Sequence, residues 1–289
     1  MSEILRVSRV GVGHLTYNQL RSKRFTAPLR GVRVTEPETE VSETEFGARV
    51  ALAAARPGAV LCDVTAAAWW GLPLPPFLTE PNSPVGLAVP PTAAAPRHRM
   101  ARGRRLELPP DHIVQDRGCF VTTPARTWVD CAAMLRDEDL LAMGDAGLRM
   151  GLFDDDALGQ MVTWAYRRRG VAHARLVRPL LNGLAESPGE SRVRFRCIAA
   201  GLPAPECQIH LRYGGQFVAR LDMGWRAERV ALEYDGIVHL PEAQRRKDAL
   251  RRNRIQEAGW RLLVVTIDDL RNSAPMIHLI RQALDNPIR

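Results

Sequence analysis

Two carboxylates stand at alternate positions of the segment "ALEYDGIVHL" at residues 231–240, and a glycine and a histidine follow them. Side chains at alternate positions of a β-strand point to one face, so Glu233 and Asp235 share a face opposite to Leu232 and Tyr234. Buried strand positions rarely carry acids. The pattern leaves two interpretations open, a metal site or two acids on a solvated face.

Asp222 is the expected partner of Glu233. The segment "FVARLDMGWRAERVALEYDG" reads as a hairpin, and a turn centred on Ala227 and Glu228 puts Asp222 opposite Glu233. Directly opposed residues have Cβ atoms ~4.5–5.5 Å apart, and a cation such as Mg²⁺ would offset the repulsion between two carboxylates that close. A slip of one residue in register would remove this pairing. In the alternative, the two acids pair with Arg220 or Arg226 on a wet face.

Glu190 is a third candidate acid. In "SPGE", Ser187 can cap a helix, Pro188 suits its first position, and Glu190 follows the cap by three residues. This spacing is that of a capping box. A carboxylate in the first turn of a helix could also lean over the hairpin and meet the same ion, so the two roles are compatible.

A basic helix is predicted after the hairpin, ending at Gly259. Its cations predict either a solvated face or contacts with the phosphates of a nucleic acid. They are Arg245, Arg246, Lys247, Arg251, Arg252 and Arg254. His239 lies just before this helix and is a candidate for donating a proton or positioning a water molecule.

Residues 185–285 resemble the Vsr-like branch of the PD-(D/E)XK nuclease superfamily, the small domains related to the very-short-patch-repair endonuclease. The features that carry the resemblance are Glu190, Gln208, Asp222, Glu233, Asp235, His239, Asp248 and Arg252, in this order. The resemblance implies a restriction-endonuclease-like mixed sheet flanked by helices. It also implies hydrolysis of DNA phosphodiesters with Mg²⁺ or Mn²⁺.

The same resemblance implies roles for single residues. Asp222 and Glu233 would ligate the cation, and Glu190 would assist directly or through water. Asp235 stands where much of the superfamily has a lysine that orients the attacking water. His239, Gln208 or Lys247 would have to replace that lysine, or activity is lost. Whether the substrate is nicked, cut through both strands or selected by its structure stays open.

The N-terminal region resembles that of AbiEi-type antitoxin proteins in "LTYNQLRSKRFTAPLRGVRV", "VTAAAWWGLPLP" and "FVTTPARTWVDCAA". This resemblance implies a winged helix at residues 14–35 that binds operator DNA, followed by a mixed α/β region. From the residues themselves, Thr16 can cap a helix over residues 17–25. It supports an alternative function, a DNA-binding regulator whose nuclease-like domain is inactive. A module that binds a toxin or a repair protein has no motif of its own here.

Composition and boundaries complete the expected organisation. The chain has 289 residues, 46% of them hydrophobic and 25% charged, with a formal net charge of +8. The composition is that of a soluble globular protein, and the positive charge favours a polyanionic partner. We expect two domains, residues 1–184 and 185–289, divided at "AESPGES". A basic tract, "RHRMARGRR", lies at residues 97–105.

Other features bear on location and packing. The chain lacks an apolar run of the ~20 residues that a membrane helix needs and lacks a signal-peptide pattern, so we expect a cytoplasmic protein that does not enter membranes. Five scattered cysteines are expected as small buried residues rather than as a disulfide framework. Trp69, Trp70 and Trp128 are expected in the core. The oligomeric state is not predicted.

Overall fold

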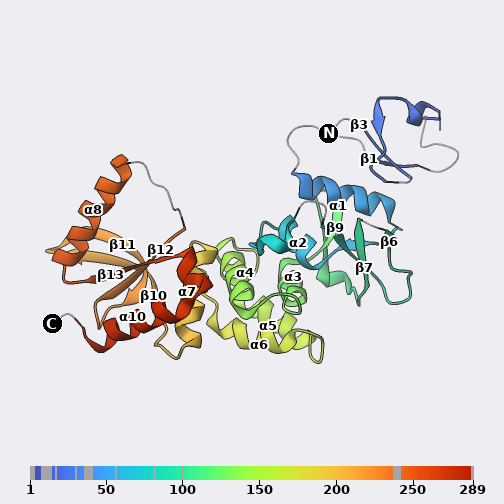
Figure 1. The fold of residues 1–289 in the computed structure, drawn as a ribbon. Coiled ribbons are helices and arrows are strands. Elements are labelled where there is room, and N and C mark those ends of the chain that lie inside the picture. Colours follow the sequence, from blue (N-terminus) through green and yellow to red (C-terminus); the bar gives the residue numbers. More distant parts are fainter. Residues whose placement is uncertain are drawn as a thin grey trace. The chain divides into compact units, whose positions relative to one another are not determined.

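The structure is a computed structural model that describes residues 4–7, 15–16, 18–29, 31–35, 42–55, 57–80, 83–98, 100–236 and 242–287, without the side chains of residues 44, 97, 98 and 242–247. The described chain divides into two compact units. The first comprises Met1–Met134 and Thr163–Gly170, and the second comprises Leu135–Val162 and Val171–Arg289. Figure 1 shows the elements of both units along the chain.

The first unit contains a small and a large sheet. The small sheet has the order β1-β3-β2 and the large sheet the order β6-β7-β5-β4-β9-β8. The strands are β1 (Ile4–Arg6), β2 (Phe25–Thr26), β3 (Val32–Thr35), β4 (Val60–Leu61), β5 (Val85–Val89), β6 (Arg97–His98), β7 (Ala101–Arg105), β8 (Ile113–Asp116) and β9 (Cys119–Thr122). The large sheet is mixed, because β5 is parallel to β7 and antiparallel to β4.

Helices α1 (Glu43–Ala54), α2 (Asp63–Trp69) and α3 (Pro124–Cys131) accompany these sheets. Ser42 caps α1 by accepting a hydrogen bond from the backbone N–H of Glu45. The alanine-rich face of α1 and Trp69 of α2 pack on buried residues of β4, β5 and β9. Trp128 is fully buried, so the expectation that Trp69 and Trp128 belong to the core is confirmed.

The helix expected at residues 17–25 is shorter in the structure. Within the described part of this segment, the only helical element is a 3-10 turn, η1 (Gln19–Arg21). Thr16 does bond to this turn, because its hydroxyl and backbone N–H both donate to Oε1 of Gln19. Leu20 is the buried residue of the turn. Among the described residues 18–25 only Leu20 is buried, so a longer helix would have no apolar face to bury, which accounts for the difference.

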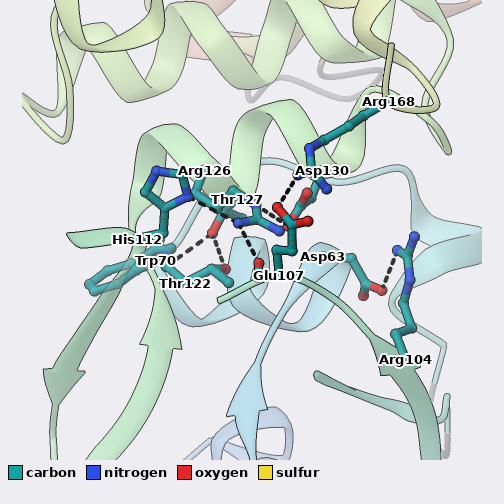
Figure 2. A network of polar contacts seen from close by, with 10 residues as sticks. All are labelled: Asp63, Trp70, Arg104, Glu107, His112, Thr122, Arg126, Thr127, Asp130 and Arg168. Atoms are coloured by element: carbon teal, nitrogen blue, oxygen red, sulfur yellow. Dashed lines mark hydrogen bonds and ion pairs between the residues drawn. The ribbon is translucent and has the colours of Figure 1, made fainter. Parts of the chain in front are cut away.

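A buried arginine, Arg126, is the centre of a network of polar contacts in the first unit (Figure 2). Arg126 is 1% exposed and donates from Nε to Asp130 and from Nη1 to the carbonyl of Glu107. Its guanidinium also stacks on Trp164, whose ring is stacked by Arg168 as well. Burial raises the pKa of Asp130 although Arg126 opposes this shift. The cluster holds the segment around Trp164 within the first unit.

The second unit contains seven described helices and a four-stranded sheet, and two of the helices follow the last strand of the sheet. Its helices are α4 (Asp137–Arg149), α5 (Asp155–Trp164, whose last two residues fall in the first unit), α6 (Val171–Val177), α7 (Pro188–Ala199), α8 (Glu242–Glu257), α9 (Ile267–Arg271) and α10 (Ser273–Asp285). Its strands are β10 (Glu206–Tyr213), β11 (Gln216–Trp225), β12 (Val230–Asp235) and β13 (Arg261–Thr266), in this spatial order. It also contains the 3-10 turn η4 (Arg178–Leu180), whereas the 3-10 turns η2 (Pro76–Leu78) and η3 (Pro110–His112) belong to the first unit.

Strands β10, β11 and β12 are antiparallel neighbours, and β13 runs parallel to β12 after the crossover through α8. Residues of α7 and α10, including Val193 and Ile280, pack with Leu232 in one cluster. Ile255 of α8 packs with Ala231 in another. The sheet is therefore covered on one face by α8 and on the other by α7 and α10 (Figure 1).

The unit boundary differs from the one expected at residues 185–191, because α4 packs against α7. Asp145 of α4 is completely buried and pairs with Arg194 of α7 at 2.7 Å. Asp139 pairs with Arg192 in the same way, at 3.0 Å. The spacing of apolar residues along a helix does not reveal ion pairs of this kind. From the sequence alone, α4 is therefore expected in the N-terminal domain.

Two further sequence expectations can be compared with the structure. All five cysteines are buried free thiols, as expected. None of the described helices is long and apolar enough to span a membrane.

Candidate functional site

The hairpin of β11 and β12 has the expected register over three residue pairs. Met223 pairs with Leu232, Gly224 with Ala231 and Trp225 with Val230. The next pair would be Asp222 with Glu233, but the ladder ends before it. Instead, Oδ2 of Asp222 accepts a hydrogen bond from the backbone N–H of Tyr234 at 3.0 Å. The two acids therefore lie at the point where the strands separate.

The regular alternation of β11 also breaks at Asp222. Leu221 packs in the cluster of Ile255 on α8, whereas Met223 packs in the cluster of Val193 on α7. On the neighbouring strand, Gln208 has φ of +54°, in the left-handed region that a residue other than glycine rarely adopts. Irregular backbone of this kind allows side chains to depart from the regular alternation between the two faces of a strand.

Asp222 carries an unusual pKa. Burial raises the pKa of its carboxyl from 3.8 to about 6, and the negative charges of Glu190 and Glu233 add to the increase. The N–H of Tyr234 and the charge of Arg251 act in the opposite direction. Three acids from α7, β11 and β12 therefore share one electrostatic environment. They are the three acids that the sequence analysis considered as ligands of one ion.

Glu190 keeps its capping position and also faces the hairpin. Its backbone N–H donates to Ser187 at 3.1 Å, which confirms the predicted cap of α7. Its carboxylate is 7% exposed and accepts from the backbone N–H of Glu186 at 3.0 Å and from Nε2 of Gln208 at 3.2 Å. Within the described structure, the other end of this amide, Oε1 of Gln208, is buried and has no hydrogen-bond partner. An unpaired buried carbonyl oxygen is costly and calls for an explanation.

Glu233 is bound by Arg251 of α8. Nη1 of Arg251 donates to Oε2 of Glu233 at 2.7 Å, and Nη2 donates to Oε1. Nη2 also donates to the carbonyl of Arg220 at 2.9 Å. The side chains of Glu233 and Arg251 are 15% and 36% exposed. Arg251, expected as a phosphate contact, therefore has its guanidinium on an acid of the candidate site, and the spacing of basic residues along α8 did not single it out.

The arginines considered as partners of the two acids are used elsewhere. Arg220 pairs with Glu186 at 2.6 Å, and Arg226 pairs with Glu206 at 2.7 Å. Asp235 is the last residue of β12, half-buried, and its backbone is in register with Thr266 of β13.

The structure locates the remaining candidates on α8 only in part. Arg252 and Arg254 are exposed. Arg245, Arg246 and Lys247 lie in the helix, but their side chains are outside the described atoms, and His239 is outside the described residues. The charge of Asp248 acts on Arg251, where it raises the pKa of the guanidinium together with Glu233.

Metal binding was expected at Asp222, Glu233 and Glu190. Among the described residues, no group of three or more His, Cys, Asp or Glu side chains is arranged so that it could hold a metal ion. By their chemistry, the carboxylate oxygens of Asp222 and Glu233 and the unpaired amide oxygen of Gln208 are hard donors. Oxygen donors of this type are those that Mg²⁺ takes.

Comparison with known proteins identifies relatives of the chain. The uncharacterized proteins MT2308 and Rv2248 of Mycobacterium tuberculosis, strains CDC 1551 / Oshkosh and ATCC 25618 / H37Rv, are each 33% identical to it over 214 residues. The similarity covers 74% of this chain and 76% of each relative. No protein-family model and no solved structure matches the chain. The chain belongs to the same family as these two mycobacterial proteins.

Proposed function

We propose that the second unit is a DNA endonuclease domain that hydrolyses phosphodiester bonds with a divalent cation, Mg²⁺ or Mn²⁺. The observation that carries the proposal is the meeting of Glu190, Asp222 and Glu233 beside the unpaired oxygen of Gln208. The pKa of Asp222 is raised by burial and by the charges of two neighbouring acids, and a bound cation or a proton would compensate its charge. Carboxyls with a pKa perturbed in this way are typical of functional sites.

The donors present suit a hard cation. Tyr234 binds only Oδ2 of Asp222, so Oδ1 can contribute a ligand, and the unpaired Oε1 of Gln208 is a further oxygen donor. Each oxygen of an ionised carboxylate accepts along two lone pairs, so the bonds from Arg251 leave Glu233 able to contribute a ligand. Glu190, whose carboxylate already accepts two hydrogen bonds, would act on the site through its charge or through water.

The order of elements supports the same proposal. Helix α7 precedes three antiparallel strands, and α8 crosses over to the parallel strand β13. This is the arrangement implied by the resemblance to Vsr-like nucleases, in which the acids come from the first helix and from the second and third strands. A cation at this position would polarise the phosphate and favour attack by water.

The chain's own residues would divide the remaining work. Arg251 supplies the positive charge that Asp235 cannot supply, and it orients the carboxylate of Glu233 through two hydrogen bonds. Arg252 and Arg254 are exposed on the same helix and are available to bind phosphates of the DNA backbone. His239 stays a proposed proton donor.

The second candidate function is a DNA-binding regulator of antitoxin type with an inactive nuclease-like domain. One observation favours it. Arg251 bonds to both oxygens of Glu233, so a guanidinium can neutralise this acid without any metal. In that case the acids and Arg251 form a structural ion-pair cluster.

The test is cleavage by the purified full-length protein. Supercoiled plasmid, linear duplex, mismatched duplex and single-stranded DNA are incubated with Mg²⁺, Mn²⁺ or EDTA. We expect cleavage that requires the cation and falls at least ~100-fold in Asp222→Asn and Glu233→Gln. Loss of a residue that only orients a metal ligand already lowers activity by up to ~100-fold, and loss of the ligand itself should lower it at least as much. Glu206→Gln is the matched control, since Glu206 is an acid of the same sheet that pairs with Arg226 away from the cluster.

Two outcomes would count against the proposal. Equal cleavage by wild type, Asp222→Asn and Glu233→Gln would mean that a contaminant or another site cuts the DNA. Binding of DNA without cleavage of any substrate under either metal would favour the regulator. Arg251→Gln distinguishes the two roles of that residue. The variant loses cleavage if the charge of Arg251 takes part in catalysis, and it keeps cleavage if Arg251 only takes the place of the metal at Glu233.

A further inference from the structure

Two arginines of the basic tract at residues 97–105 converge on one buried acid in the first unit. Nη2 of Arg102 donates to Oδ1 of Asp63, and Nη1 of Arg104 donates to Oδ2, both at 3.1 Å. Arg102 and Arg104 are two residues apart on β7, so their side chains share a face of the sheet. The Asp63 carboxylate and its ion pair with Arg104 are visible in Figure 2. We name these three residues the arginine fork.

The fork is fixed by the backbone around it. Asp63 has φ of +45°, a strained value for a residue other than glycine, and its side chain is completely buried. It lies directly on Gly86 of β5, where a Cβ atom would collide with Oδ1. The N–H of Gly86 donates to the hydroxyl of Thr65 at 2.8 Å. Asp63 is thus held rigidly beneath the two guanidiniums, which limits the entropy they lose on binding a ligand.

The charges of the fork do not cancel. One carboxylate faces two guanidiniums, which leaves one positive charge at a surface site. The side chains of Arg102 and Arg104 remain 44% and 32% exposed. Each guanidinium has five N–H donors and uses one of them on Asp63, so donors remain for a ligand in solvent. Two converging guanidiniums with spare donors are well suited to a phosphate group.

We propose that the arginine fork binds one phosphate of the DNA backbone, so that the first unit has a DNA contact separate from the segment at residues 14–35. The site is open, so a single free phosphate would gain little there, whereas a polymer adds contacts elsewhere on a chain of net charge +8. The inference goes beyond the proposed hydrolysis and does not depend on it.

The test is fluorescence anisotropy of a labelled DNA duplex bound by the full-length chain in EDTA, across a series of KCl concentrations. EDTA excludes cleavage, so this experiment can succeed or fail whether or not the protein is a nuclease. Arg102→Gln keeps Asp63 paired with Arg104 and should weaken binding several-fold. The slope of log K against log[KCl] should change by up to about 0.9, the value for one phosphate contact.

A second variant removes both guanidiniums without leaving a buried charge. In Asp63→Asn/Arg102→Gln/Arg104→Gln the carboxylate and its partners are neutralised together, and circular dichroism verifies folding. We expect the full loss of about 0.9 in slope and a ~10-fold weaker affinity at moderate salt. Arg105→Gln is the matched control, because Arg105 is exposed and adjacent on β7 but points to the other face.

Three results would overturn the inference. Affinity and slope unchanged in both fork variants would show that the fork does not touch DNA. An equal loss in Arg105→Gln would show a general effect of charge. Binding of inorganic phosphate or poly-glutamate that is lost in the fork variants, while their affinity for the duplex is unchanged, would assign the fork to a small anion or an acidic protein.

Discussion

Replacing Asp222 by asparagine should stabilise the protein at neutral pH, although it removes a proposed metal ligand. The pKa of Asp222 rises from 3.8 to about 6 on folding, first because of burial and then because of Glu190 and Glu233. Each pKa unit corresponds to ~1.36 kcal/mol, so the ionised carboxylate costs at most about 3 kcal/mol. Asp222 is only partly buried, and screening by solvent reduces our expectation to roughly 1–2 kcal/mol. Asparagine keeps an oxygen that can accept from the N–H of Tyr234.

The sign of the effect depends on pH in a defined way. Below pH ~4 the carboxyl is protonated in the folded and the unfolded chain, so Asp222 costs nothing. Between pH ~4 and ~6 the folded state keeps the proton that the unfolded state has lost, so the stability contributed at this site falls as pH rises. Above pH ~6 the penalty is complete. The advantage of Asp222→Asn should therefore be absent at pH 4 and full at pH 7.5.

The assay is thermal unfolding in EDTA at pH 4, 6 and 7.5, followed by circular dichroism. A gain of 1–2 kcal/mol corresponds to roughly 2–8 °C in Tm for a unit of this size. Glu206→Gln is the control with the opposite electrostatics, since hydrogen bonding to Arg226 lowers the pKa of Glu206 and its neutral variant should gain nothing. A variant Asp222→Asn that is no more stable than wild type at pH 7.5, or equally favoured at pH 4, would refute the reasoning.

Two further predictions concern the packing that supports the site. Arg194→Met should destabilise the second unit by about 3–5 kcal/mol in denaturant unfolding, because Asp145 would remain completely buried without its counter-charge; a loss below 1 kcal/mol would contradict this. Gly189→Ala should cost about 1–3 kcal/mol, because its new methyl group would collide with the ring of Tyr234. The matched change Gly47→Ala, in a helix position with open space, should instead stabilise the chain by about 0.5–1 kcal/mol in the same measurement.

Much of the second unit could be predicted from its pattern. The cap at Ser187, the hairpin register and the acids of the site follow from residue types and spacings that act locally. The large sheet of the first unit could not be predicted to the same extent. Strand β4 has only two residues, Val60 and Leu61, too few for a period of two to be recognised.

Within the site, the missing information was three-dimensional. The positive φ of Gln208 and the break of alternation at Asp222 leave no trace in hydrophobic periodicity. The same holds for Asp63, a residue that looks like an ordinary helix start but is buried beneath two arginines. In each case a polar residue takes its role from a neighbour distant in the chain.

Arg251 changes the interpretation of Asp235, which stands where much of the PD-(D/E)XK superfamily has a lysine. A lysine at position 235 would bring a positive charge to the acids from β12 itself. The structure brings such a charge from α8, because the side chains of Arg251 and Ile255 are one helical turn apart and Ile255 is buried against the sheet. Arg251 therefore reaches Glu233 only while α8 is packed on β11 and β13. The charge at the site depends on docking of this helix, so any change that loosens α8 should affect Glu233 before it affects the fold of the sheet.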